Sequence, residues 1–132
     1  MKPKRKIYPT VEEIIQANKD ILAKLKVYKA EKFGLLAGRH LIEEILQKVK
    51  RKHGDVYDKA IILLKELIIR HPFESANRRT AVVVTAVFLD INRKKINIIH
   101  DTNILQGIRE GYYKDEEIKG WLKGGKMRAF KR

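Results

Sequence analysis

Hydrophobic residues recur every three or four positions along most of the chain, a spacing that is typical of amphipathic helices. The pattern predicts six helices, at about residues 11–25, 39–53, 56–70, 77–89, 102–110 and 115–123. Polar signals mark several of their ends. Thr10 and Glu13 form a capping box ahead of the first helix, and Gly54 and Gly111 are expected to end the second and the fifth. We therefore expect an all-α fold.

The segment 77–89 decides the fold class, because its run of valines could also form a strand. It contains no helix breaker, and its length favours a helix over a strand. Such a helix would be apolar nearly all round. We expect it to be the most buried helix, with the others packed around it in a compact bundle.

Residues 27–38 contain two glycines and show no helical period, so they predict an ordered loop or a short hairpin near residues 28–38. Both ends of the chain are basic, at residues 1–8 and 125–132, and we expect residues 126–132 to form a frayed tail. We find no internal repeat. The 132 residues fit a single domain spanning the whole chain.

The chain carries 30 Lys and Arg against 16 Asp and Glu, a formal net charge of +14. This charge favours an acidic partner such as nucleic acid, a nucleotide or an acidic antagonist protein, although scattered lysines are more often just a solvated surface. With no cysteine, disulfides and thiolate metal sites are excluded.

The basic residues at positions 1–6 are not followed by a long apolar stretch, so they do not read as a signal peptide. No apolar run approaches the roughly 20 residues that a membrane span requires. We expect a cytoplasmic protein that makes no membrane contact.

The decapeptide at residues 71–80, His-Pro-Phe-Glu-Ser-Ala-Asn-Arg-Arg-Thr, connects two of the predicted core helices. The start of a helix attracts phosphate, and here it would present the amides of Ser75, Ala76 and Asn77. Arg78 and Arg79 would add positive charge to this site. An imidazole such as that of His71 can accept a proton from a hydroxyl near neutral pH.

Each of these residues also has a purely structural explanation. His71 could simply end a helix, Phe73 could belong to the core, and Asn77 could be the N-cap. Arg78 and Arg79 could be surface charges. However, cations in a first helical turn are unfavourable, which argues for a bound anion. Taken as a spaced set between two core helices, these residues favour the functional interpretation.

The decapeptide resembles the central motif of the Fic/Doc family, H-x-F-x-[D/E]-[G/A]-N-[G/K]-R. The matching residues are His71, Phe73, Ala76, Asn77 and Arg79. Ser75 stands where the family has an acidic residue. The resemblance implies a compact α-helical protein that transfers a phosphate-containing group from a nucleotide to a protein hydroxyl.

Within the family, the run Arg78-Arg79-Thr80 is most similar to the Doc (death-on-curing) toxins, which have Lys-Arg-Thr there. AMP-transferring members typically have Gly at the position of Arg78 and a further Arg at the position of Val82. The Doc resemblance implies a toxin that phosphorylates a translation elongation factor and is held in check by a partner antitoxin.

The resemblance also implies roles for individual residues. His71 would be the general base, and Asn77, Arg78 and Arg79 would hold the phosphates of ATP together with the loop amides. Because Ser75 is neutral, Mg²⁺ would have to be held by Glu74 or through water on Ser75, or the chain is weakly active or inactive. A flap would dock the target by strand-like pairing, and it comprises Lys32, Phe33, Gly34, Leu35 and Leu36.

Two other functions stay open. One is a degenerate, non-catalytic member of the family that binds nucleic acid or an antitoxin through its positive charge. The other is an AMP transferase, which Arg78 and Val82 disfavour.

Overall fold

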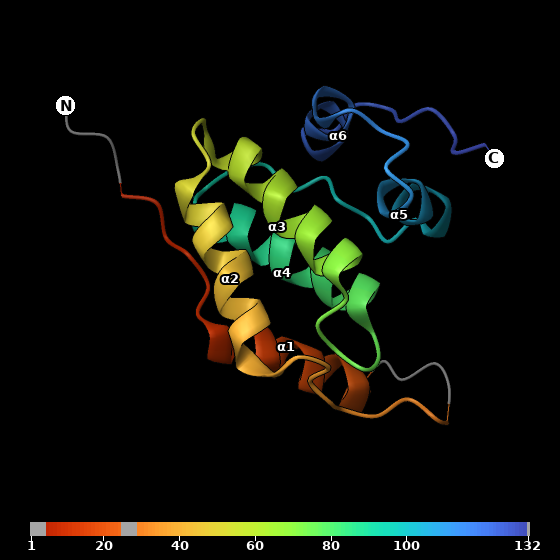
Figure 1. Cartoon of the computed structure of the whole chain (residues 1–132). Helices are drawn as coiled ribbons and strands as arrows, with labels where there is room; N and C mark the ends of the chain where they lie inside the picture. Colours follow the sequence, from red (N-terminus) through yellow and green to blue (C-terminus); the bar gives the residue numbers. More distant parts are fainter. Residues whose placement is uncertain (1–4, 25–28, 132) are drawn as a thin grey trace.

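The computed structural model describes residues 5–24 and 29–131, and these residues fold into six helices. Figure 1 shows the helices in chain order: α1 (Val11–Lys24), α2 (Gly38–Arg51), α3 (Val56–Arg70), α4 (Asn77–Ile91), α5 (Thr102–Arg109) and α6 (Asp115–Leu122). The described residues contain no β-sheet, and their one β-type pairing is an isolated antiparallel bridge between Leu35 and Phe73. The prediction of an all-α fold is confirmed.

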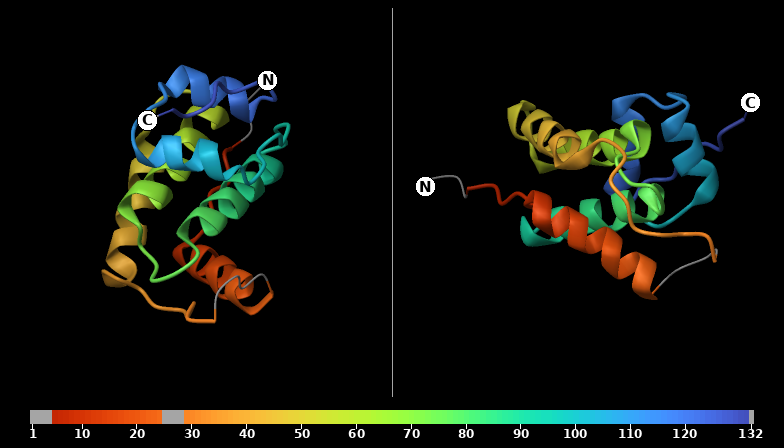
Figure 2. Two further views of the ribbon diagram at one scale, coloured as in Figure 1. Left: turned by 90° about the vertical axis from the view of Figure 1, so that its right-hand side faces the viewer. Right: turned by 60° about the horizontal axis from the view of Figure 1, so that its bottom comes forward.

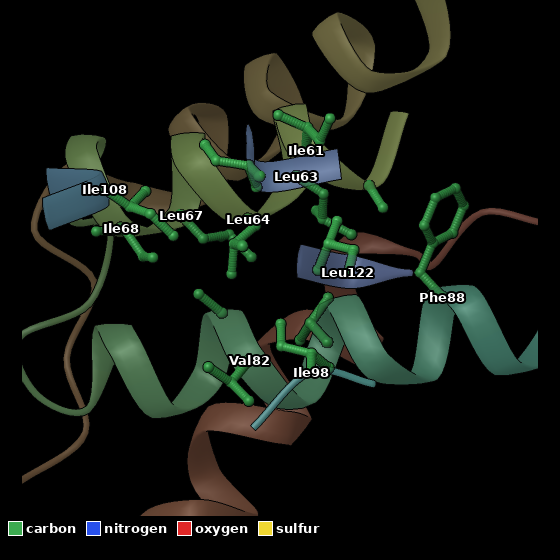
Figure 3. Close-up of a cluster of buried hydrophobic side chains, with 14 of the residues drawn as sticks. Ile61, Leu63, Leu64, Leu67, Ile68, Val82, Phe88, Ile98, Ile108 and Leu122 are labelled. Carbon is green, nitrogen blue, oxygen red and sulfur yellow. The ribbon is translucent and has the colours of Figure 1, made fainter. Parts of the chain in front are cut away.

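Helices α3 and α4 pack against each other at the centre of the molecule. Helix α2 covers α3, helix α1 covers α4, and α5 and α6 pack on α3 from the other side (Figures 1 and 2). Figure 3 shows the resulting core, to which α3 contributes Leu64 and Leu67 and α4 contributes Val82 and Phe88. This arrangement places the α3–α4 loop, and with it the decapeptide, at one end of the central helix pair.

Residues 77–89 do form a helix, but the expectation that it would be the most buried one is wrong. Both central helices have 15 residues, and α3 buries ten of them while α4 buries eight. The difference lies in Val83, Val87 and Ile91, whose side chains stay exposed along a groove of about 580 Å³ beside α1. Helix α1 alone is too narrow to cover that face of α4.

The predicted capping box of α1 is present, since Thr10 and Glu13 exchange side chain–main chain hydrogen bonds of 3.0 and 3.1 Å. Helix α2, however, ends at Arg51 rather than near Gly54. The ammonium group of Lys59, a buried residue, donates to the carbonyls of Val49, Lys50 and Lys52 at 3.2, 2.9 and 2.8 Å. Because Lys59 binds these last carbonyls, the chain turns extended at Lys52.

The described part of the predicted 28–38 hairpin pairs with another segment instead of with itself. The amide of Leu36 donates to the carbonyl of Pro72 (3.0 Å), and the amide of Glu74 donates to the carbonyl of Gly34 (2.9 Å). The flap is therefore an extended segment held against the decapeptide. Residue 28 of the predicted hairpin lies outside the described residues, as do residues 1–4 of the basic N-terminus.

The expectation of a frayed C-terminal tail is wrong for residues 126–131. Asn103 and Phe130 exchange two hydrogen bonds, of 3.1 and 2.8 Å, and the hydroxyl of Tyr113 donates to the carbonyl of Arg128. The guanidinium of Arg128 binds Glu117 at 2.6 Å and lowers the pKa of that carboxyl to about 2. Composition alone treats this segment as a basic run. Its apolar and paired side chains, however, anchor it on α5 and α6.

No helix in the described ranges combines the length and the apolar character needed to cross a bilayer.

Candidate functional site

The α3–α4 loop is held in an unusual backbone conformation. His71 ends α3 and Ala76 precedes α4, both with left-handed backbone angles (φ 53° and 64°). Ala76 therefore occupies the N-cap position that the structural interpretation gave to Asn77. The buried side chain of Asn77 instead accepts from the amide of Phe73 at 2.9 Å and donates to its carbonyl at 2.7 Å. Its side chain thus clamps the loop, and its main-chain amide begins the helix.

A second buried amide, from α1, supports the loop from beneath. Asn18 donates to the carbonyl of Ser75 (2.9 Å) and to the hydroxyl of Thr80 (3.0 Å). The sequence did not identify Asn18 as a supporting residue, because a single polar residue on an apolar helix face does not reveal its hydrogen-bond partners. The contacts fix the start of α4 relative to α1.

The start of α4 offers main-chain donors. Its first helical hydrogen bond runs from the amide of Thr80 to the carbonyl of Ala76 (2.9 Å), so the amides of Asn77 and Arg78 stand outside the helical ladder. The helix dipole adds partial positive charge at this end. No acidic side chain lies in the first turn to compensate it.

A cavity of about 520 Å³ opens above this helix end. It brings together His71 and all five residues predicted to bind phosphate, namely Ser75, Ala76, Asn77, Arg78 and Arg79. It also includes residues that the sequence did not single out, which are Glu31, Ile68, His100, Thr102 and Arg109. Arg109 lies at the end of α5 and reaches the cavity because α5 packs on α3. No local spacing in the sequence predicts this contact.

Positive charge dominates this cavity and acts on His71. Burial, and then the nearby charges of Arg109 and Arg78, lower the pKa of His71 below its ordinary 6.5. Burial and Arg109 likewise lower the pKa of Arg78, whose guanidinium binds the side chain of Gln106. His71 is therefore neutral at pH 7 and able to accept a proton.

Arg79 is engaged by an acidic partner within the cavity. Its guanidinium forms an ion pair with Glu31, and the two side chains are only 19% and 10% exposed. An incoming phosphate would compete with this carboxylate for Arg79. Glu31 immediately precedes the flap, so the chain leading into the flap supplies a counter-charge to the decapeptide.

The residues expected to hold Mg²⁺ are Glu74 and Ser75. Glu74 is exposed and pairs with the ammonium of Lys32 at 3.5 Å, and the hydroxyl of Ser75 accepts from the amide of Lys32 at 3.3 Å. The described residues contain no group of three acidic or histidine side chains that could hold a metal ion. Protein side chains alone therefore do not fit a complete Mg²⁺ site here.

The flap lies along the rim of this site. Phe33 approaches Phe73 with ring centroids 6.5 Å apart, and the ammonium of Lys19 lies 4.8 Å from the Phe33 ring centre. Leu36 is 60% exposed. The backbone hydrogen bonds of Gly34 and Leu36 with the decapeptide, described above, flank the bridge between Leu35 and Phe73. Of the two forms predicted for this region, the described residues adopt the ordered loop and not the hairpin, and its place beside the decapeptide was not predicted from the sequence.

Comparison with known sequences and with protein-family models places the chain among its relatives. A search of curated protein sequences finds none that matches significantly. The model of the Fic/DOC family matches residues 8–89, which is more than half of the chain and includes the whole decapeptide. The six-helix architecture agrees with that match. This chain belongs to the Fic/DOC family.

Proposed function

We propose that this chain is a Doc-like toxin that transfers the terminal phosphate of ATP to a hydroxyl group of a target protein. The observation that carries the proposal is the cavity at the start of α4, where the imidazole of His71 meets three arginines and the amides that lie outside the helical ladder. Members of this family are often transferases, which supports an enzymatic role. The target, by resemblance, is a translation elongation factor.

The proposed reaction uses His71 as general base. Its neutral imidazole takes the proton of the target hydroxyl while the hydroxyl oxygen attacks the γ-phosphorus. The bond from that phosphorus to the β–γ bridging oxygen breaks, and ADP leaves. Arg78, Arg79 and the amides at the start of α4 offset the negative charge of the phosphates.

Mg²⁺ would have to come with the nucleotide. Its phosphates would supply most of the ligands, and Glu74 or a water on Ser75 would supply the remainder. When bound, the ion would neutralise phosphate charge. The carboxylate of Glu74 must leave Lys32 to take part, and their exposed 3.5 Å pair is weak enough to open.

Two protein partners belong to this proposal. The extended flap, with Phe33 and Leu36 partly exposed, is our candidate for docking the target's backbone. An antitoxin would cover the apolar groove beside Val83 and Val87, which no described part of the chain fills. Both assignments rest on the Doc-like activity.

Label transfer tests the proposed activity. The purified chain is incubated with a host extract or a purified elongation factor and either γ-labelled or α-labelled ATP. We expect the γ-label to appear on a protein hydroxyl, His71→Ala to abolish the transfer, and the exposed-histidine control His53→Ala to retain it. Transfer of the α-label would instead identify an AMP transferase, and no transfer from either position would favour a non-catalytic binding protein.

The missing acidic residue makes a second prediction. Ser75→Asp should raise Mg²⁺-dependent transfer about tenfold or more, because it adds a carboxylate beside the phosphates. The matched control is Ser75→Asn, whose side chain has the same shape as that of Ser75→Asp but adds no charge. If Ser75→Asp leaves the rate unchanged, then Glu74 or the nucleotide already holds the metal.

A further inference from the structure

The end of the molecule opposite the decapeptide carries a dense group of cations. We name this surface the basic pole; it consists of residues 5–6, 50–52 and 93–95, every one of which is Lys or Arg and exposed. It gathers the segment before α1, the end of α2 and the residues after α4 (Figure 1). Helix α3 runs from this pole to the decapeptide and α4 runs back, so about 22 Å, the length of a 15-residue helix, separates the two ends.

Contacts confirm that these segments meet. Arg5, Lys6, Arg93 and Lys94 line one hollow of about 510 Å³, together with the apolar residues Ile7, Val56 and Ile91 and the polar residues Asp55 and Asn92. The ammonium of Lys50, in the last turn of α2, lies 5.8 Å from the ring centre of Tyr8, which follows Lys6 by two residues. These contacts join the segment before α1 to the end of α2 and to the residues after α4, although these segments are up to 90 positions apart in sequence.

The cations of the basic pole differ from most others in lacking acidic partners. Within the described ranges, no ion pair involves any of its eight residues. Elsewhere in the molecule, acidic side chains form ion pairs with Lys65, Arg70 and Arg128, among others. Asp55, which lines the hollow, contacts Lys119 at 3.4 Å and accepts from the amide of Asp58 as the N-cap of α3, so its carboxylate is already engaged. Eight of the 30 Lys and Arg residues therefore lie on this surface with no ion pair among the described residues.

Helix dipoles account for part of this arrangement, because α2 and α4 both end here and cations favour helix C-termini. They do not account for all of it. The carbonyls that end α2 are already bound by Lys59. Arg5 and Lys6 belong to no helix.

We propose that the basic pole binds nucleic acid through its phosphate backbone. Unpaired cations around a concave surface suit a phosphate chain that releases counterions on binding. The aliphatic residues that line the hollow, Ile7, Val56 and Ile91, can contact bases. A membrane surface fits less well, since the pole is hollowed and carries no exposed Trp or Phe for insertion. This binding is independent of the proposed transferase activity.

The test compares two variants that remove equal charge. One loses four lysines of the pole, by Lys6→Gln, Lys52→Gln, Lys94→Gln and Lys95→Gln. The other loses four exposed lysines elsewhere, by Lys24→Gln, Lys29→Gln, Lys114→Gln and Lys131→Gln. Fluorescence anisotropy would measure binding to a labelled DNA duplex and to an RNA hairpin between about 50 and 200 mM salt. Circular dichroism checks that both variants fold.

We expect the pole variant to lose at least about tenfold in affinity and the control variant to lose less than about threefold. On duplex DNA, four lost phosphate contacts should flatten the slope of log K against log salt by about 3.6. ATP binding at the decapeptide should be unchanged in the pole variant. Equal losses in both variants would overturn the proposal, and so would wild-type binding to phosphatidylserine vesicles without binding to either nucleic acid.

Discussion

At the residue scale, the decapeptide divides its work between structure and chemistry. Phe73 and the side chain of Asn77 are buried and hold the loop, while His71, Arg78 and Arg79 face the cavity. The motif therefore contains residues that determine the conformation of the loop as well as residues that form the site. A spacing match cannot separate these roles, because both need the same residues in the same places.

The pairing of Arg79 with Glu31 predicts competition with phosphate. Glu31→Gln should tighten ATP binding about fivefold or more, because the ligand no longer has to displace a carboxylate from a largely buried arginine. Calorimetric titration with ATP measures the effect. Glu116→Gln, which removes an exposed acid remote from the cavity, should leave the affinity unchanged. Weaker binding in Glu31→Gln would show that Glu31 assists the ligand instead.

The surroundings of His71 predict its titration. Its pKa should lie below 6.5, so activity that needs the neutral base should fall only as the pH drops through that lowered pKa. Arg109→Gln should raise the pKa by removing the nearest positive charge, and Arg51→Gln should not. NMR titration of the imidazole measures all three. A wild-type pKa at or above 6.5 would contradict the described environment.

At the scale of single elements, helix ends are set by contacts that sequence windows do not contain. Helix α3 was predicted with its observed bounds, because apolar residues fill its period and Gly54 and Pro72 flank it. Helix α2 was predicted too long, because Lys59, on the next helix, binds its last carbonyls. The C-terminal segment was misjudged for a similar reason, since Asn103 and Glu117 hold it from α5 and α6.

The capping role of Lys59 predicts a stability cost. Lys59→Ala should lower the free energy of unfolding by about 2–4 kcal/mol, because it leaves three carbonyls at the end of α2 without their donor. Urea denaturation measures the loss. The exposed neighbour Lys52→Ala should cost less than about 0.5 kcal/mol. Equal effects of the two substitutions would refute the capping role.

At the scale of the whole molecule, the two proposed anion sites lie at opposite ends of the α3–α4 pair. The sequence predicted the all-α fold and one end, the decapeptide. It could not predict that Arg109 and Glu31 would join that end, or that residues 5–6, 50–52 and 93–95 would meet at the other. These groupings depend on which helix ends come together, and only tertiary packing decides that.

The most direct test of the central claim is where ATP binds on this strongly basic protein. Calorimetry would compare the wild type with Arg79→Ala at the cavity and Lys94→Ala at the basic pole. We predict that Arg79→Ala raises the Kd for ATP by about 10- to 150-fold, equivalent to about 1.5–3 kcal/mol for a charge-assisted hydrogen bond, and that Lys94→Ala changes it less than about twofold. Equal affinities for the wild type and Arg79→Ala would contradict a nucleotide site at the start of α4.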